Sequence, residues 1–179
     1  YTFLKEALGA DAGRVLTQVS DYTGQPETQG GLVKTLDFKI YLGLLTERYN
    51  QLHRQDLART GALPIDLVVV NLYPFAATVA KPGTTVEMAR ANIDIGGPTL
   101  IRAAAKNYLR VASLVDPADY GPLLEMLRTQ AGGLDLAYRF NLARKAFAHT
   151  AEYDRAIAAH LADTPDAPML GCYTIMNRA

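Results

Sequence analysis

The sequence predicts an α/β domain built around a mostly parallel sheet, and two observations lead to that prediction. Short β-branched stretches alternate along the chain with longer stretches that carry helix caps, which is typical of strands connected by helices. The clearest strand falls at residues 65–72, where an almost unbroken apolar run indicates burial on both faces, as in a parallel sheet. Further strands are expected at residues 14–19 and 110–115, and helices on the two faces would complete a three-layer domain.

Helix signals account for most of the remaining chain. Gly9 and Gly61 each follow a helical stretch and are expected to end it. Residues 84–87 fit a capping box, and Pro98 suits the first position of a helix. Helices are therefore expected at residues 2–8, 46–60, 84–92, 117–130 and 134–161, and from residue 98 onward.

The remaining segments suggest where the domain ends and a tail begins. Residues 20–31 are typical of a loop, and residues 32–45 fit either a strand or a helix. The helix expected at 134–161 is either a helical addition to the α/β domain or a dimer surface. Because Thr164 opens a Pro-containing, linker-like segment, we expect one domain over residues 1–163 and a tail over residues 164–179.

Composition excludes several classes of function. The 179 residues carry 18 basic and 18 acidic side chains, so the chain lacks the basic excess of a general nucleic-acid binder. No apolar run approaches the ~20 residues that a membrane helix needs. A single cysteine, Cys172, excludes a disulfide framework and a cysteine-rich zinc site, which favours a cytoplasmic protein.

Histidines and short motifs give no metal or cofactor site. His149 and His160 share a helical face but would stand about 16 Å apart, too far to share a metal, and His53 is expected to be solvated. The sequence contains no Gly-x-Ser-x-Gly, Walker A or Gly-x-Gly-x-x-Gly motif. These absences argue against the familiar hydrolase, ATPase and dinucleotide sites.

The first candidate site is the segment from Asp94 to Lys106. Gly96 and Gly97 allow close approach of a ligand, and the helix that follows offers N–H groups and a positive dipole end. Thr99, Arg102 and Lys106 fall on one face of that helix. The alternative is a capped helix with a solvated stripe of basic side chains.

Two further candidates follow other predicted elements. Asn71 and Tyr73 point to the same side at the end of the clearest strand, where open α/β sheets bind ligands; turn formation and core packing are the alternatives. Lys34 and Thr35 come after a glycine pair and could hold a phosphate; a surface lysine at the start of an element is the alternative.

Taken together, several blocks resemble the IMP cyclohydrolase domain of the bifunctional purine biosynthesis proteins. The most specific are Asn-Leu-Tyr-Pro-Phe at residues 71–75 and Asp-Ile-Gly-Gly-Pro-Thr at residues 94–99. The blocks that match, in chain order, are residues 19–24, 33–36, 65–75, 92–99, 102–107 and 145–154. The similarity covers most of residues 14–162.

This resemblance implies a methylglyoxal-synthase-like fold, a homodimer and closure of the ribotide FAICAR to IMP with loss of water. It also implies that no metal or organic cofactor takes part, and a separate AICAR transformylase is a possible partner. Lys106 would be the proton donor and acceptor, and Asp94 with the backbone of Ile95 would orient the reacting groups. Tyr73 and Lys34 would support the transition state. The residues expected to line the nucleotide site are Lys34, Thr35, Val70, Asn71, Asp94, Ile95 and Gly96.

The chain departs from the family pattern around Lys34. Leu32 replaces an arginine, Asp37 and Tyr41 replace two histidines, and Gln25 replaces a phenylalanine. Losing an arginine removes a bidentate phosphate contact, and an added carboxylate would repel phosphate unless it points away. These changes support a second hypothesis, a nucleotide-binding or sensor relative without catalysis. A dimerisation or scaffold module is a third.

The resemblance also concerns the ends of the chain. Residues 1–5 resemble the helix after the second strand of the family, so we expect about 40 further residues upstream that hold part of the phosphate site. With no room for a formyl-transfer domain, a stand-alone cyclohydrolase is expected. The central geometric expectation is that Lys106, Asp94 and Asn71 converge on one purine-sized cavity.

Overall fold

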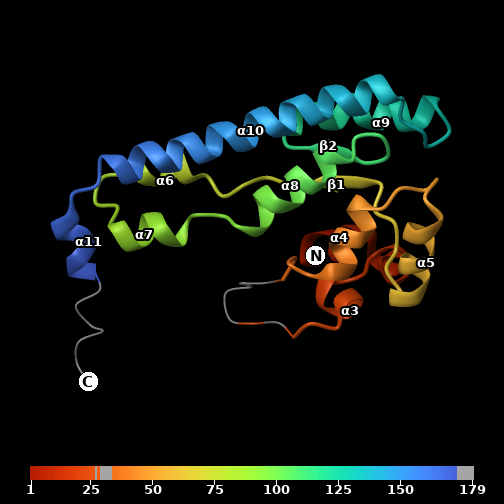
Figure 1. Ribbon diagram of the computed structural model, residues 1–179, viewed down its shortest axis with the longest axis horizontal. Helices are drawn as coiled ribbons and strands as arrows, with labels where there is room; N and C mark the ends of the chain where they lie inside the picture. Colours follow the sequence, from red (N-terminus) through yellow and green to blue (C-terminus); the bar gives the residue numbers. More distant parts are fainter. Residues whose placement is uncertain (27, 29–33, 173–179) are drawn as a thin grey trace. The chain divides into compact units, whose positions relative to one another are not determined.

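The computed structural model describes residues 1–26, 28 and 34–172, and the chain divides into two compact units, Tyr1–Ile65 and Asp66–Ala179 (Figure 1). In the described residues, the first unit is helical. Its elements are α1 (Thr2–Leu8), the 3-10 helix η1 (Gly9–Asp11), α2 (Ala12–Val15), α3 (Val19–Thr23), α4 (Phe38–Leu45) and α5 (Gln51–Thr60). The helix expected at residues 2–8 is confirmed as α1.

The strand expected at residues 14–19 is wrong. These residues include the end of α2, the extended Leu16 and the start of α3, and no strand is present among the described residues of this unit to pair with them. Because a strand needs hydrogen-bonded neighbours, a short alternating pattern by itself cannot form one. Gly24 adopts a left-handed conformation with φ of 80° and ends α3.

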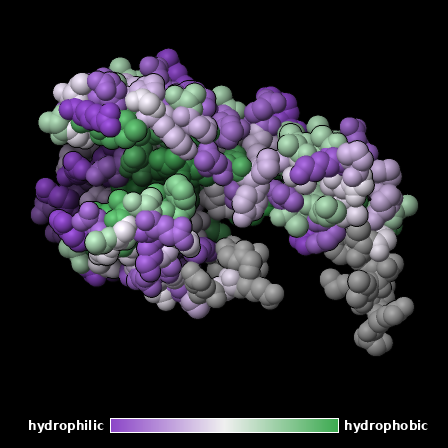
Figure 2. Space-filling model, turned by 180° about the vertical axis from the view of Figure 1, so that it is seen from behind, coloured by the Kyte–Doolittle hydropathy of each residue, from purple (hydrophilic) through white to green (hydrophobic). Residues whose placement is uncertain are grey.

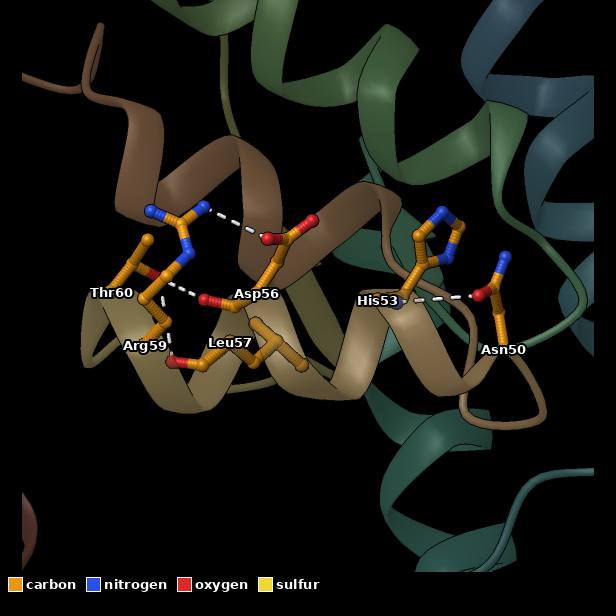
Figure 3. Close-up of polar contacts among 6 residues, drawn as sticks. All are labelled: Asn50, His53, Asp56, Leu57, Arg59 and Thr60. Carbon is orange, nitrogen blue, oxygen red and sulfur yellow. Dashed lines mark hydrogen bonds and ion pairs between the residues drawn. The ribbon is translucent and has the colours of Figure 1, made fainter.

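Side-chain caps fix the ends of α4 and α5. The ambiguous stretch at residues 32–45 is helical over Phe38–Leu45, where the Asp37 carboxylate caps α4 by accepting a hydrogen bond from Lys39 N. Helix α5 begins five residues later than expected, because Asn50 Oδ1 accepts hydrogen bonds from Leu52 N and His53 N. Figure 3 shows the second of these, between Asn50 and His53. Helix α5 ends, as expected, at Gly61, with φ of 66°.

The contacts of α5 are local. Arg59 pairs with Asp56 at 2.9 Å, and the Thr60 hydroxyl donates to the Asp56 carbonyl at 2.6 Å (Figure 3). His53 is half-buried rather than solvated, and its Nδ1 accepts a hydrogen bond from Glu47 N at 3.1 Å. These groups stabilise the helix and its entry and give no separate site.

The second unit contains a two-stranded parallel sheet in the described residues. Strand β1 (Leu67–Val69) pairs with β2 (Ala112–Leu114), with Val69 opposite Leu114. The other elements are α6 (Phe75–Val79), α7 (Val86–Ala91), α8 (Gly96–Lys106), the 3-10 helix η3 (Pro117–Asp119), α9 (Tyr120–Thr129), α10 (Leu136–Ala162) and α11 (Asp166–Cys172). The strands expected at 65–72 and 110–115 are confirmed in shorter form.

Burial of the two strands differs. All residues of β2 are buried, whereas in β1 only Val68 is buried and Leu67 and Val69 are 37% and 48% exposed. The expectation that β1 is covered on both faces is therefore wrong. The apolar run was enough to predict a strand. Whether each face of that strand is buried depends on helices that are distant in sequence.

Helix α10 holds this unit together. It lies beside α8 and α6 and contacts β2 (Figure 1). One core cluster joins Ile101 and Ala105 of α8 to Ala143 and Ala146 of α10, and a second joins the two ends of β2 to helices α9 and α10. The helix expected at 134–161 is confirmed, and it starts where Asp135 accepts a hydrogen bond from Tyr138 N at 2.6 Å.

The starts of α7 and α8 and the chain after residue 164 also differ from expectation. Thr85, not Thr84, caps α7 by accepting a hydrogen bond from Met88 N, so the capping box is not formed. Helix α8 begins at Gly96, two residues before Pro98. The linker-like interpretation of the chain after Thr164 is wrong over Asp166–Cys172, which form α11 and contact α7.

Large apolar side chains also lie at the surface of both units, interspersed with polar ones (Figure 2). Phe3 and Tyr49 of the first unit are 78% and 74% exposed. Over the residues that the structure describes, no helix combines the length and apolar character required to cross a membrane.

Tyr138 on α10 gives a first test of this core. Its hydroxyl is buried without a hydrogen-bond partner among the described residues, and burial raises the pKa of its phenol. Because an unsatisfied buried hydroxyl costs free energy, we expect Tyr138→Phe to leave the free energy of unfolding unchanged or to raise it by up to about 1 kcal/mol. Urea unfolding measures the difference, and a clear loss of stability would show that the hydroxyl has a partner.

Candidate functional site

The carboxyl edge of the parallel sheet brings together residues from both strands. Val70 follows β1 and donates its N–H to the Leu114 carbonyl at 3.0 Å, so the parallel ladder continues to this residue. Asn71 comes next, and its Nδ2 donates to the Tyr120 hydroxyl at 3.3 Å. Since open α/β sheets bind ligands beyond the carboxyl ends of their strands, this edge is the natural place for a site.

Helix α8 begins at the same edge. A Cβ atom placed on Gly97 would lie 2.6 Å from Leu72 Cδ2, so the first turn of α8 is packed directly against the chain that leaves β1. Val70 and Leu72 also pack against the core cluster that contains Ile101 and Ala105 of this helix. The structure therefore brings the predicted residues Val70, Asn71, Ile95 and Gly96 to one region of the second unit.

The half-buried Asp94 is the anchor of this region. Its Oδ1 accepts a hydrogen bond from Gly97 N at 2.9 Å, which caps the start of α8. A Cβ on Gly97 would lie 2.5 Å from Asp94 Oδ2, so only glycine leaves the carboxylate in place. Among the described residues, Oδ2 receives no hydrogen bond and can accept one from a ligand.

This geometry changes the interpretation of the glycine pair. The space beside Gly97 is filled by Asp94 and Leu72, so this glycine makes room for the protein's own carboxylate rather than for a ligand. One N–H of the helix N-terminus is likewise taken by Asp94. The Thr99 hydroxyl donates to the carbonyls of Ile95 and Gly96 at 2.7 and 3.0 Å.

The exposed face of α8 carries the predicted polar stripe. Thr99, Arg102 and Lys106 are all exposed, which confirms that they share a face. The Arg102 guanidinium lies 5.5 Å from the centre of the Phe147 ring on α10, a cation–π contact that holds it beside the helix. Lys106, the last residue of α8, has no partner among the described residues.

Lys106 and Asp94 lie at opposite ends of α8. The 11 residues from Gly96 to Lys106 place the helix ends about 15 Å apart along the axis. A lysine side chain on a helix points back toward the N-terminus, which narrows the gap but does not close it. The expected convergence of Lys106 with Asp94 and Asn71 is therefore not found, and a substrate contacts both Lys106 and Asp94 only if it lies along α8.

Tyr73 is close to this region. It is 54% exposed and begins the turn into α6, with its carbonyl accepting a hydrogen bond from Phe75 N. Burial is the main cause that raises the pKa of Tyr153 on α10, and the nearby Asp94 and Tyr73 add to that increase. Asp94 and Tyr153 are joined by a hydrogen bond at 2.8 Å, and Tyr73 directly follows Leu72, whose side chain lies beside Gly97.

Lys34 and Thr35 belong to the first unit. They form the turn before α4, where Lys34 is exposed and Thr35 is half-buried. Their roles stay predictions, and Leu32 lies outside the described residues.

Two residues that differ from the family pattern, Gln25 and Asp37, contact each other in the first unit. Asp37 is buried, at 7% exposure, and its Oδ2 accepts a hydrogen bond from Gln25 Nε2 at 2.7 Å while its Oδ1 caps α4. The carboxylate of Asp37 is therefore oriented by local contacts, and the change at Gln25 supplies one of them. Tyr41 also lies in α4, where its hydroxyl is buried without a partner among the described residues.

A cavity of about 430 Å³ lies at the end of β2. Its lining residues are Val115, Asp116, Pro117, Lys145, Ala148 and His149. The Lys145 ammonium lies 3.1 Å from Asp116 Oδ2 and 2.7 Å from Asp119 Oδ2. Sequence reasoning treated Asp116 only as a cap and missed this cluster, although Lys145 and His149 fall in the block at residues 145–154.

The charged forms of Asp116 and Lys145 are stabilised. Hydrogen bonds from Ala118 N and then from Lys145 lower the pKa of Asp116, and the hydrogen bond with Asp119 raises the pKa of Lys145. At neutral pH the lysine is therefore a fixed cation in an ion pair rather than a proton acceptor. In the part of the chain that the structure describes, no three His, Cys, Asp or Glu side chains gather to hold a metal ion.

Comparison of the chain with family models identifies the family to which it belongs. The family model described as "MGS-like domain" matches residues 6–99, and the model described as "AICARFT/IMPCHase bienzyme" matches residues 104–177. The chain belongs to the MGS-like domains, whose model covers more than half of it, and its C-terminal part matches the family of the AICARFT/IMPCHase bienzymes. The methylglyoxal-synthase-like fold expected from the sequence is thereby confirmed.

Individual relatives agree with this assignment. The bifunctional purine biosynthesis protein PurH of Chloroflexus aurantiacus is 55% identical over 155 residues, which are 87% of this chain and 30% of PurH. PurH of Cyanothece sp. is 54% identical over 150 residues, 84% of this chain and 29% of PurH. The crystal structure of ForH is 34% identical, with a TM-score of 0.68, and the similarity covers 86% of this chain and 80% of that one. The chain thus spans about 30% of the length of the curated relatives it matches.

Proposed function

We propose that this chain is an IMP cyclohydrolase that closes FAICAR to IMP with loss of water. The observation that carries the proposal is the carboxylate of Asp94, fixed by Gly97 N at the carboxyl edge of the sheet with Oδ2 open to a ligand. The family supports the class of substrate, because the PurH relatives are named purine biosynthesis proteins. The chemistry of the ring closure then determines what each residue must do.

The first half of the reaction forms the new C–N bond. The carboxamide nitrogen of FAICAR attacks the formyl carbon, gives up one proton, and the formyl oxygen takes up a proton to become a hydroxyl group. An amide nitrogen is a weak nucleophile, so a hydrogen-bond acceptor must polarise its N–H. Asp94 Oδ2 is the acceptor that the site offers, and the exposed Tyr73 hydroxyl is a donor for the developing charge on the formyl oxygen.

The second half removes water. The nitrogen that carried the formyl group loses its proton, the hydroxyl group receives a proton and leaves as water, and the ring C=N bond forms. We assign the proton donor and acceptor role to Lys106, whose ammonium has no partner among the described residues. Because Lys106 and Asp94 lie at opposite ends of α8, the proposal requires the substrate to lie along the exposed face of this helix.

The remaining residues bind the nucleotide. Val70, Asn71, Ile95 and Gly96 lie at the sheet edge and at the start of α8, and they are assigned to the base and ribose side of the substrate. Lys34 and Thr35 belong to the first unit, and their roles, nucleotide binding for both and support of the transition state for Lys34, stay predictions from the resemblance. We further propose that the protein is a cytoplasmic homodimer, with a separate AICAR transformylase as a possible partner.

The direct test is conversion of FAICAR to IMP by the purified protein, followed by ultraviolet absorbance. Turnover above the rate without protein supports the proposal. If nucleotide binds tightly while wild-type and Lys106→Ala proteins are equally inert, the sensor hypothesis replaces it. If neither nucleotide nor phosphate shifts the melting temperature, the scaffold hypothesis replaces it.

The buried Asp37 bears on the sensor hypothesis. That hypothesis rests on Leu32, Asp37 and Tyr41, and in particular on repulsion between a new carboxylate and the substrate phosphate. Since the Asp37 carboxylate accepts hydrogen bonds from Lys39 N and Gln25, its presence is explained by local structure and does not require lost catalysis.

Gly97→Ala tests the placement of Asp94. The added methyl group would meet Asp94 Oδ2 and Leu72 Cδ2, so the carboxylate must move. We expect kcat to fall by about tenfold or more, since a misplaced catalytic group loses its alignment with the substrate. Steady-state kinetics measure the effect.

Gly121→Ala is the matched control. Gly121 lies near the start of α9, and a Cβ there meets nothing within 4 Å. Alanine is the better helix former, so this variant should keep full activity with equal or greater stability. Full activity in Gly97→Ala would mean that the position of the Asp94 carboxylate does not matter to the reaction.

A further inference from the structure

Tyr153 of helix α10 reaches across to the loop that carries Asp94. Its hydroxyl accepts a hydrogen bond from Asp94 N at 2.8 Å and donates one to the Asn92 carbonyl at 3.2 Å. One phenol thus holds both sides of the short segment between α7 and α8. The two partners are 59 and 61 residues away in sequence, so this contact is a product of the fold.

The ring of Tyr153 is itself held in place. It is half-buried and makes an edge contact with Phe75, whose side chain is fully buried, at 6.3 Å between ring centres. Burial raises the pKa of the Tyr153 phenol, so the hydroxyl stays protonated at neutral pH. A protonated hydroxyl has one donor and can also accept, which the two hydrogen bonds require.

Asp94 is therefore fixed at two points. Its carboxylate is held by Gly97 N, and its backbone N is held by Tyr153. Each of these contacts alone leaves rotations about the backbone or the side chain of Asp94 open. Together they determine where Oδ2 points, and a catalytic acceptor needs its position fixed in advance.

We propose that Tyr153 is a positioning residue that orients Asp94 for the ring closure through the Asp94 amide. The proposal rests on the proposed function, because it assigns Tyr153 a role in the alignment of a catalytic carboxylate. It does not place Tyr153 in contact with the substrate. Removal of the hydroxyl should then act on turnover through Asp94 and through no other group.

Tyr153→Phe is the variant that isolates the hydroxyl, because the ring and its contact with Phe75 remain. We expect kcat for FAICAR closure to fall about tenfold while KM changes less than twofold, as for loss of an interaction that matters in the transition state. In an Asp94→Asn background, Tyr153→Phe should cause no further loss. Equal losses in both backgrounds would overturn the proposal.

Tyr138→Phe is the matched control. Tyr138 lies on the same helix, its phenol pKa is also raised by burial, and its hydroxyl has no partner among the described residues. Its removal should leave kcat and KM at wild-type values. A loss of turnover in Tyr138→Phe equal to that in Tyr153→Phe would assign the effect to α10 in general and overturn the specific role.

A second measurement separates this proposal from the proposed function. Amide hydrogen exchange should show the Asp94 N–H protected in the wild-type protein, and its protection should fall in Tyr153→Phe but not in Tyr138→Phe. If the wild-type protein does not convert FAICAR, the cyclohydrolase assignment fails, and the exchange data still decide whether Tyr153 holds the loop. An unprotected Asp94 N–H in the wild type overturns the proposal without any variant.

Discussion

Asp94→Asn is expected to lower kcat for FAICAR closure by about 10²- to 10³-fold, within the range that general acid–base groups contribute. The asparagine side chain has the same size, and its oxygen can still accept the hydrogen bond from Gly97 N that caps α8. What it lacks is the negative charge and basicity needed to polarise the carboxamide N–H. Steady-state kinetics with FAICAR measure the loss, and thermal unfolding checks that the fold is intact.

Two comparisons make the result specific. Asp135→Asn changes another aspartate that caps a helix, since Asp135 accepts a hydrogen bond from Tyr138 N at the start of α10, and it should keep wild-type turnover. Asp94→Ala removes the cap as well and should add a stability cost of about 1 kcal/mol. Wild-type turnover in Asp94→Asn would remove this carboxylate from the mechanism.

Several features of the fold were predictable because their signals are local. Gly61 ends α5 in a left-handed conformation, and Asp116 begins the helical turn before α9 by accepting a hydrogen bond from Ala118 N. Such caps act within four residues and can be recognised in a single sequence. The length of α10 was predictable for the same reason, because neither glycine nor proline interrupts it.

Other features depend on packing or pairing partners that are distant in sequence and cannot be identified from a local pattern. The apolar run around Val68 predicted a strand, but which of its faces is covered depends on helices that lie elsewhere in the chain. Residues 14–19 alternate like a strand, but they form the end of α2, an extended Leu16 and the start of α3, and no described strand of their unit pairs with them. Asp166–Cys172 form a helix that contacts α7, which the linker-like composition did not indicate.

In the candidate site, too, some features could be predicted from the sequence and others could not. Asn71 and Asp94 could be placed near one edge, because the ends of parallel strands and the start of the helix between them meet there. The hydrogen bonds of Tyr153 and the pairing of Lys145 with Asp116 join residues far apart in sequence, and no local pattern indicates them. The contact between Gln25 and Asp37 spans 12 residues within the first unit, and no cap or turn pattern indicates it either.

Lys106→Ala is the second variant with a large expected effect. We expect kcat to fall by about 10²- to 10³-fold, because a proton donor and acceptor is lost. Lys106 is exposed at the end of α8 and has no partner among the described residues, so the fold should be unaffected apart from a small loss of favourable charge at the helix C-terminus. FAICAR turnover and the melting temperature test the two parts of this expectation.

Two variants define what the amine of Lys106 does. Arg128→Ala removes a cation from the last turn of α9 and should keep full activity, which controls for the general loss of a helix-terminal charge. Lys106→Arg keeps the charge but holds its proton too tightly to exchange it near neutral pH. Restored turnover in Lys106→Arg would show that the charge alone is needed, whereas an inactive Lys106→Arg supports proton transfer.

The outcome at Lys106 also decides how the substrate lies. Asp94 and Lys106 are separated by the length of α8, so losses of turnover at both ends mean that one nucleotide extends along the exposed face of this helix, past Arg102. A loss at Asp94 with wild-type turnover in Lys106→Ala would confine the reaction to the carboxyl edge of the sheet. The proton would then have to come from another group near that edge, and the exposed Tyr73 hydroxyl, which follows β1 in the chain, would be the first to substitute.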